Sequence, residues 1–100
     1  MMKKIYKYPI EIIDIQTVKL PKGAIMLTAQ LQHGKPYIWA YVDPNEIEAE
    51  DVTLRVYGTG QEIDDSLDLT YVGTIQIREK FIGEPWCDNR IFVWHVFKVD

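Results

Sequence analysis

The residues best suited to binding chemistry form the stretch Tyr57-Gly58-Thr59-Gly60, which lies two positions after Arg55. Two glycines around a threonine let a ligand approach the main chain, and they can leave backbone N–H groups open for a phosphate. Arg55 would add a cation on the outward face of the preceding strand. The stretch lacks the Gly-Lys-Ser/Thr of a P-loop and no helical pattern follows it, so an ordinary β-turn or bulge is the alternative.

Aromatic side chains are the second feature. Trp39 alternates with Ile38 and Ala40, so it shares a face with the tyrosines at positions 37 and 41. If the aliphatic residues point into the core, the aromatic row points outward, where it needs a partner subunit or bases on which to stack. For Trp39 and Trp94 the alternative of a second core layer stays open.

Catalytic constellations are poorly supported by the sequence. Nucleophilic catalysis needs a Ser, Cys or Thr beside a base, but His33 falls in a turn, His95 falls among apolar strand residues, and Cys87 falls in a loop. The aspartates between residues 64 and 68 lack the ligand ladder of a calcium loop, and one Cys with two distant His residues makes no zinc site. We therefore expect no enzyme, no metal and no cofactor.

Length and composition favour one ordinary folded domain over residues 1–100. The chain has 100 residues, of which 47% are hydrophobic and 26% charged, as in typical globular domains. The single cysteine allows no intrachain disulfide, which fits a reducing cytoplasm.

The charge balance argues against a nucleic acid polymer as partner. The net charge is −4 and the pI about 5.1, whereas a non-specific duplex binder carries a basic patch. One small anionic ligand held by a few local cations remains compatible with this balance. No apolar run approaches the length of a membrane span, and no apolar region follows Met1-Met2-Lys3-Lys4, so we expect neither a membrane partner nor a signal peptide.

Strand patterns fill most of the chain, and no helical period is sustained. The strands that we expect lie at residues 5–12, 17–20, 24–32, 37–42, 52–57, 70–78 and 91–99. Six or seven antiparallel strands predict an all-β fold, either a small sandwich or a half-open barrel. Sequential hairpins are the expected connections.

Alternation also predicts which faces are buried. Over residues 24–32, one face would carry Ile25, Leu27, Ala29 and Leu31. Over residues 52–57, the inward face would carry Val52, Leu54 and Val56. Residues 46–51 read as a solvated acidic loop or a single helical turn, and residues 79–90 as a long loop.

Six short pieces, in order along nearly the whole chain, carry a family resemblance. They are Tyr6-Lys7-Tyr8-Pro9-Ile10, Leu20-Pro21-Lys22-Gly23-Ala24, Trp39-Ala40-Tyr41-Val42-Asp43-Pro44, Tyr57-Gly58-Thr59-Gly60, Tyr71-Val72-Gly73-Thr74 and His95-Val96-Phe97. With these pieces the chain resembles a group of small phage-encoded proteins catalogued as a domain of unknown function. The loop at residues 79–90 is longer than this family leads us to expect, so no contact there is carried over.

The same group is similar to the phage sponge proteins that defeat cyclic-oligonucleotide (anti-CBASS) signalling. That resemblance implies a cytoplasmic homo-oligomer, a tetramer, that sequesters a cyclic dinucleotide such as cyclic GMP–AMP without cleaving it. Under this hypothesis Trp39 and Tyr57 contact bases, Arg55 contacts a phosphate, and the loop Gly58-Thr59-Gly60 allows close approach. Tyr8 is a further candidate contact.

Two other functions compete with the sponge. The first is a protein-binding module that inhibits or adapts a host or virion protein, which an acidic surface and an aromatic row would serve equally well. The second is a nuclease or phosphodiesterase, which would require metal ligands that the sequence does not assemble.

Overall fold

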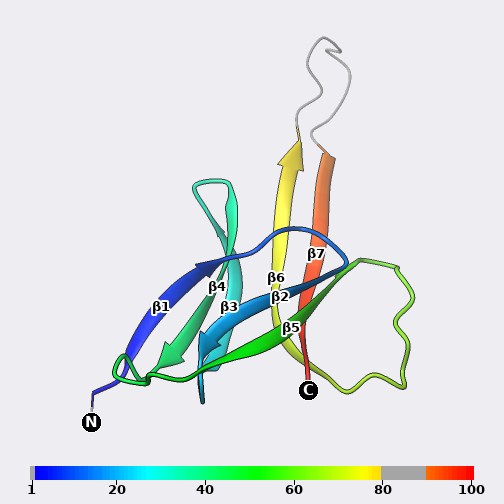
Figure 1. The fold of residues 1–100 in the computed structure, drawn as a ribbon. Coiled ribbons are helices and arrows are strands. Elements are labelled where there is room, and N and C mark those ends of the chain that lie inside the picture. The colour runs from blue at the N-terminus through cyan, green and yellow to red at the C-terminus, as the bar shows by residue number, and fades with distance from the viewer. Residues whose placement is uncertain (1, 80–89) are drawn as a thin grey trace.

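The structure, a computed structural model, describes residues 2–79 and 90–100. The strands are β1 (Lys4–Pro9), β2 (Ile15–Pro21), β3 (Ile25–Gln32), β4 (Lys35–Val42), β5 (Ala49–Gly58), β6 (Leu69–Glu79) and β7 (Arg90–Val99) (Figure 1). The predicted all-β fold is confirmed. Within the described residues no helix long and apolar enough to cross a membrane occurs. The loop expected between β6 and β7, with Trp86 and Cys87, lies outside the described residues.

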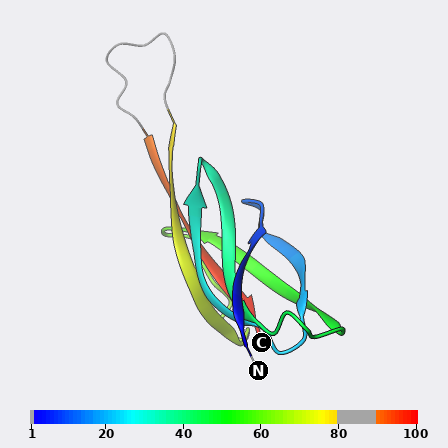
Figure 2. The same cartoon turned by 90° about the vertical axis from the view of Figure 1, so that its left-hand side faces the viewer.

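The strands form two antiparallel sheets that pack as an open sandwich (Figures 1 and 2). The three-stranded sheet has the order β1-β4-β3, and the four-stranded sheet has the order β2-β5-β7-β6. The expectation of sequential hairpins is correct for β3–β4 and β6–β7 only. The chain changes sheets three times, between β1 and β2, between β2 and β3, and between β4 and β5. Within the four-stranded sheet, the connection from β5 to β6 must pass β7, which lies between them.

The core lies between the two inner faces. The three-stranded sheet contributes Ile38, Ala40 and Val42 from β4, all at most 1% exposed, and Ala29 from β3. The four-stranded sheet contributes the predicted inward row Val52, Leu54 and Val56 together with Ile75 and Val96. Because successive strand residues face opposite sides, burial of these rows turns Tyr37, Trp39 and Tyr41 outward, as the alternation predicts.

A β-bulge overturns the predicted face of β3. Met26 pairs with Ala40 but Thr28 pairs with Trp39, so Leu27 is an extra residue on this strand. A bulge shifts the alternation by one position. Ile25 and Leu27 are therefore 59% and 47% exposed, whereas Ala29 is buried. The predicted single face of Ile25, Leu27, Ala29 and Leu31 is thus wrong in its first half.

The acidic segment 46–51 is also different from the prediction, because β5 begins at Ala49. Residues 49–51 pair in register with Lys19–Pro21 of β2. Cross-strand pairing thus outweighs the weak strand propensity of Glu50 and Asp51. Upstream, β1 ends at Pro9 instead of continuing to residue 12, since proline has no N–H for the ladder.

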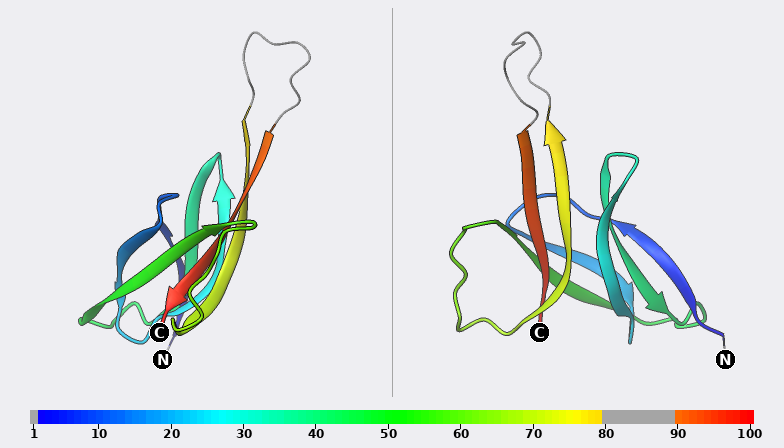
Figure 3. Two further views of the ribbon diagram at one scale, coloured as in Figure 1. Left: turned by 90° about the vertical axis from the view of Figure 1, so that its right-hand side faces the viewer. Right: turned by 180° about the vertical axis from the view of Figure 1, so that it is seen from behind.

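One side of the sandwich is closed by direct contact between β3 and β6. A Cβ on Gly73 would lie 2.5 Å from the backbone nitrogen and 2.7 Å from the backbone oxygen of Ala29. Only glycine permits this approach of the two main chains. The edge strands β1 and β2 lie on the opposite side of the sandwich (Figure 3, left). This side stays open, and residues 8–11 and 16–19 line a groove of about 520 Å³ there.

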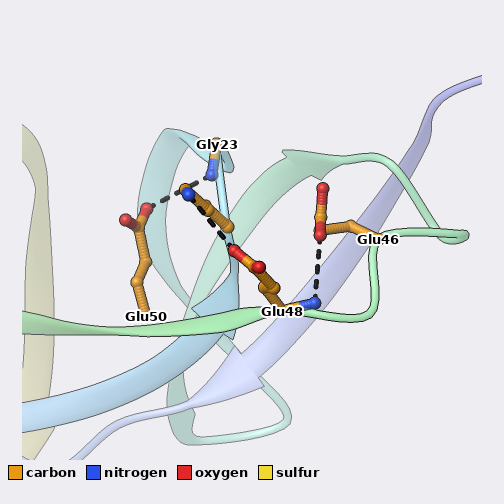
Figure 4. Close-up of polar contacts among 5 residues, drawn as sticks. Gly23, Glu46, Glu48 and Glu50 are labelled. Carbon is orange, nitrogen blue, oxygen red and sulfur yellow. Dashed lines mark hydrogen bonds and ion pairs between the residues drawn. The ribbon is translucent and has the colours of Figure 1, made fainter.

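A clasp of polar contacts holds two of the crossings between the sheets, the β2–β3 turn and the β4–β5 connection, side by side (Figure 4). The turn after β2 donates from the backbone N–H of Lys22 to the carbonyl oxygen of Glu48 at 2.9 Å. The side-chain Nζ of Lys22 donates to Glu48 Oε2 at 3.1 Å, and the N–H of Gly23 donates to Glu50 Oε1 at 3.3 Å. Since exposed ion pairs contribute little stability, the clasp serves mainly to fix the path of these connections.

Candidate ligand-binding site

The candidate site is a strip on the outer face of the four-stranded sheet. Arg55, Tyr57 and Thr59 alternate with the buried residues of β5, so they share the outward face. Across the register, Arg55 lies opposite Phe97 and Tyr57 lies opposite His95 of β7. At about 3.3 Å per residue, Arg55 and Thr59 are roughly 13 Å apart along the strand. The strip thus has a cation at one end and a hydroxyl at the other.

Aromatic rings fill the middle of the strip. Phe97 packs edge to face against Tyr57 and Tyr71, with ring centroids 5.9 and 5.6 Å away. Tyr57 is only 6% exposed, whereas Tyr71 of β6 is 57% exposed. The ring available for stacking is therefore that of Tyr71, and Tyr57 offers little free face to a base.

A chain of hydroxyl and imidazole groups borders these rings. His95 is hydrogen-bonded through Nε2 to Thr59 Oγ1 at 2.8 Å and through Nδ1 to Thr74 Oγ1 at 3.1 Å. The hydroxyl of Tyr71 bonds in turn to Thr74 Oγ1. Each hydroxyl can act as donor or acceptor, so the chain can reorient toward phosphate or ribose oxygens.

The glycine stretch forms a closed β-turn and not an open anion-binding loop. Gln61 N–H donates to the carbonyl oxygen of Gly58 at 3.1 Å, with Gly60 at φ +88° as a type II turn requires. The N–H of Gly58 donates to Gln61 Oε1, and the N–H of Thr59 donates to the carbonyl of Val93. Most of the backbone donors expected for phosphate are thus occupied, and the Thr59 hydroxyl is the exposed polar group of the turn.

A shallow pocket of about 290 Å³ adjoins this turn and is lined by Gly58, Thr59 and residues 91–94. Trp94 belongs to the inner face of β7 and packs against the core, with its ring over Gly58. A Thr hydroxyl beside an imidazole is also the arrangement of a nucleophile and its base. Two N–H groups of the turn are already bonded within the protein, so they are not free to stabilise an oxyanion.

The Tyr57 hydroxyl is buried and, among the described residues, has no hydrogen-bond partner. An unsatisfied buried hydroxyl costs about 1–3 kcal/mol. We expect Tyr57→Phe to raise the free energy of unfolding of the ligand-free protein by about 1 kcal/mol, as urea denaturation would measure. Tyr71→Phe is the matched control and should bring no gain, because the Tyr71 hydroxyl is bonded to Thr74. A destabilised Tyr57→Phe protein would mean that the hydroxyl has a partner.

Two candidate residues lie away from the strip. Trp39 is on the outer face of the three-stranded sheet, where its ring meets Tyr37 edge to face at 5.9 Å. Tyr8 is opposite Ile38 in the register, so it faces inward and lines the open groove between β1 and β2. Within one copy of the chain, the structure brings together Arg55, Tyr57 and the 58–60 turn, but it does not bring Trp39 or Tyr8 to them.

Burial, and secondarily the charge of Tyr6, raises the pKa of Tyr8 above its ordinary value of 10.0. A raised pKa in the folded state means that this contribution to stability is complete below pH 10 and is lost as the pH rises through the folded pKa. In an ultraviolet titration of phenolate absorbance, wild-type protein should show a late-ionising tyrosine that Tyr8→Phe lacks. Identical titration curves for the two proteins would contradict this assignment.

Asp64 of the 59–68 loop is bonded within the loop. Asp64 Oδ1 accepts a hydrogen bond from the N–H of Ser66 at 2.9 Å, which together with nearby Arg55 lowers the pKa of Asp64. Among the described residues, no group of three or more His, Cys, Asp and Glu side chains is placed to hold a metal ion. The loop lies on the side of β7 turned away from the three-stranded sheet (Figure 1).

Sequence reasoning missed part of the strip. His95, Phe97, Thr74 and Tyr71 join Arg55, Tyr57 and Thr59 only because β7 lies between β5 and β6. The sequence did single out the segments that contain them, since Tyr71–Thr74 and His95–Phe97 belong to the six segments that carry the family resemblance. Their adjacency, however, depends on strand order, which the local pattern does not encode.

Fold and site together define a small all-β domain with a polar-aromatic surface strip. The chain belongs to the family described as Domain of unknown function (DUF7352), whose model matches residues 1–100. No curated protein and no solved structure matches the chain.

Proposed function

We propose that this chain is a non-catalytic binding protein that captures a cyclic dinucleotide such as cyclic GMP–AMP and withholds it from its receptor. The observation that carries the proposal is the combination, on one sheet face, of one arginine, a hydroxyl–imidazole pair and an exposed tyrosine ring. We further propose that the protein is a phage immune-evasion sponge that acts as a homo-oligomer in the host cytoplasm. This more specific proposal rests on the resemblance of the chain to the phage sponge proteins.

The chemistry of the strip matches the two parts of such a ligand. Arg55 would pair with a phosphate through charge-assisted hydrogen bonds, and Thr59 would donate to a second oxygen. A purine would stack on the exposed ring of Tyr71, a contact worth about 1–3 kcal/mol. Trp39 faces away on the other sheet and Tyr8 faces the groove, so the proposal for one copy rests on Arg55, the Thr59–His95 pair and the ring of Tyr71.

A thermal-shift panel tests the proposal. The ligands are cyclic GMP–AMP, cyclic di-GMP, cyclic di-AMP and a cyclic trinucleotide, with GMP and AMP as controls. At a ligand concentration 100-fold above Kd, linkage stabilises the folded state by about 2.7 kcal/mol, which corresponds to a rise in Tm of about 10 °C or more for a chain of this size. Absence of a shift with every cyclic ligand would reject the proposal, and turnover of any of them would reject its non-catalytic part.

A protein-binding module is the second candidate, favoured by the distribution of acidic residues. Five of the fifteen acidic side chains fall in residues 43–51 and four in residues 62–68, both mainly connecting segments. Such acidic segments suit a basic surface on a partner protein. Capture of a host protein that is lost when Asp64 and Asp65 are changed to Asn, without any effect of cyclic nucleotides, would favour this second function.

A further inference from the structure

The outer face of the three-stranded sheet carries an exposed apolar row. Ile5 and Ile25 are both register partners of Tyr41, from opposite sides of β4. These three neighbouring side chains are 57%, 59% and 41% exposed. Apolar side chains that are scattered singly over a surface need no explanation, but a contiguous row across a whole sheet is typical of an interface.

The bulge in β3 enlarges this surface. As the extra residue of the bulge, Leu27 is 47% exposed beside Ile25. Trp39 and Tyr37 continue the surface along β4, each half-buried by its neighbours. Hence aliphatic residues on both flanking strands border an aromatic row on the central strand.

The charges of this sheet exclude several partners. The strands β1, β3 and β4 contain no Asp or Glu, although the whole chain has a net charge of −4. Two cations of the described strands lie on this outer face, Lys7 and, at the hairpin end of β4, the exposed Lys35; Lys7 is engaged. Its Nζ lies 4.7 Å from the centroid of the Tyr37 ring and donates to Gln32 Oε1. The face therefore presents apolar surface more than charge, which does not suit a nucleic acid or an acidic peptide.

The dimensions of the face indicate how wide its partner must be. The strands have six, eight and eight residues, and at about 3.3 Å per residue and about 4.8 Å between strands they give a projected area of roughly 350 Å². Protruding side chains raise the accessible area above that value. Complete coverage is needed to approach the roughly 600–800 Å² per partner of a stable interface. A single helix or strand covers only part of this width, whereas another flat sheet covers all of it.

We propose that a second copy of this chain covers the face, with the two three-stranded sheets packed against each other about a two-fold axis. A two-fold interface uses the same patch on both partners, so each apolar face meets one of the same size and polarity. The proposal assigns Trp39 to this interface. It does not depend on the proposed nucleotide function, because the strip with Arg55 lies on the other sheet and stays exposed in such a dimer.

Light scattering coupled to size exclusion, run over a range of protein concentrations, tests the interface without any ligand. Wild-type protein should have the mass of a dimer, or of a larger even-numbered assembly built from it. Ile25→Lys should reduce the mass to half and raise the dissociation constant at least 100-fold. Ile15→Lys is the matched control, since Ile15 is a similarly exposed strand isoleucine, 51% exposed, on the four-stranded sheet. It should leave the mass unchanged.

Leu27→Ser provides a second, milder variant in case Ile25→Lys fails to fold, with circular dichroism reporting the fold of both. Monomeric wild-type protein at every concentration would overturn the proposal, as would an Ile25→Lys protein that folds and keeps the wild-type mass. A monomer that captures a different protein through Trp39 would overturn it as well. A normal dimer without any nucleotide binding would leave this interface standing and reject only the proposed function.

Discussion

Replacing Gly73 by alanine is expected to destabilise the domain by about 3 kcal/mol or more. The new Cβ would lie 2.5 and 2.7 Å from backbone atoms of Ala29, and 3.1 Å from its Cα. Those atoms belong to the β3 ladder and cannot retreat without breaking its hydrogen bonds to β4. Overpacking a core commonly costs 1–3 kcal/mol, and a clash with backbone is at the severe end. Total stability is only about 5–15 kcal/mol at this length.

Urea denaturation would measure this effect, with Gly58→Ala as the matched control. At Gly58 a Cβ would meet only the side chain of Trp94, at 3.3 Å, and a side chain can shift. We expect Gly58→Ala to cost less than about 1 kcal/mol, since the ring needs to move by only a few tenths of an ångström. If Gly73→Ala were as stable as wild type, β3 and β6 would not approach each other as described.

Replacing Arg55 by alanine is expected to weaken cyclic dinucleotide binding by about 10- to 100-fold. A hydrogen bond to a charged group contributes about 1.5–3 kcal/mol, and each 1.4 kcal/mol changes Kd tenfold. Arg55 is partly exposed and lies opposite Ile15 and Phe97, so its loss should change the fold little. Isothermal titration calorimetry would give the dissociation constants of the wild-type protein and of Arg55→Ala.

Arg78→Ala provides the control for charge alone, because Arg78 is an exposed arginine of β6 far along the hairpin. The affinity of the Arg78→Ala protein for the cyclic dinucleotide should stay within twofold of the wild-type affinity. Equal affinities for wild type and Arg55→Ala would remove the phosphate contact from the account. A loss of affinity in both variants would indicate non-specific attraction of the ligand to positive charge.

The sequence predicted the parts of the fold that depend on local alternation. Val52, Leu54 and Val56 face the core as expected, because a strand has one side chain on each face in turn. The prediction for β3 was wrong from Ile25 to Leu27, since a bulge has no clear signature in the pattern of that strand. The strand from Ala49 was missed, because its pairing with β2 is a non-local contact.

In the candidate site, too, local alternation could be predicted from the sequence, whereas contacts between strands could not. Arg55, Tyr57 and Thr59 share a face through a spacing of two, which the sequence alone predicts. The contacts of His95 with Thr59 and Thr74 require β7 to lie between β5 and β6, and strand order follows from the whole fold. Likewise, the separation of Trp39 from Arg55 follows from the assignment of β4 and β5 to different sheets.

Mass spectrometry of the small molecules released from purified protein would show whether this chain holds a cyclic dinucleotide. The protein would be produced together with a cyclic dinucleotide synthase, purified, and denatured to release what it holds. We expect an intact cyclic dinucleotide in near-stoichiometric amount from wild type and far less from Arg55→Ala. Wild-type protein that releases no nucleotide, or only a linear cleavage product, would contradict the proposed function.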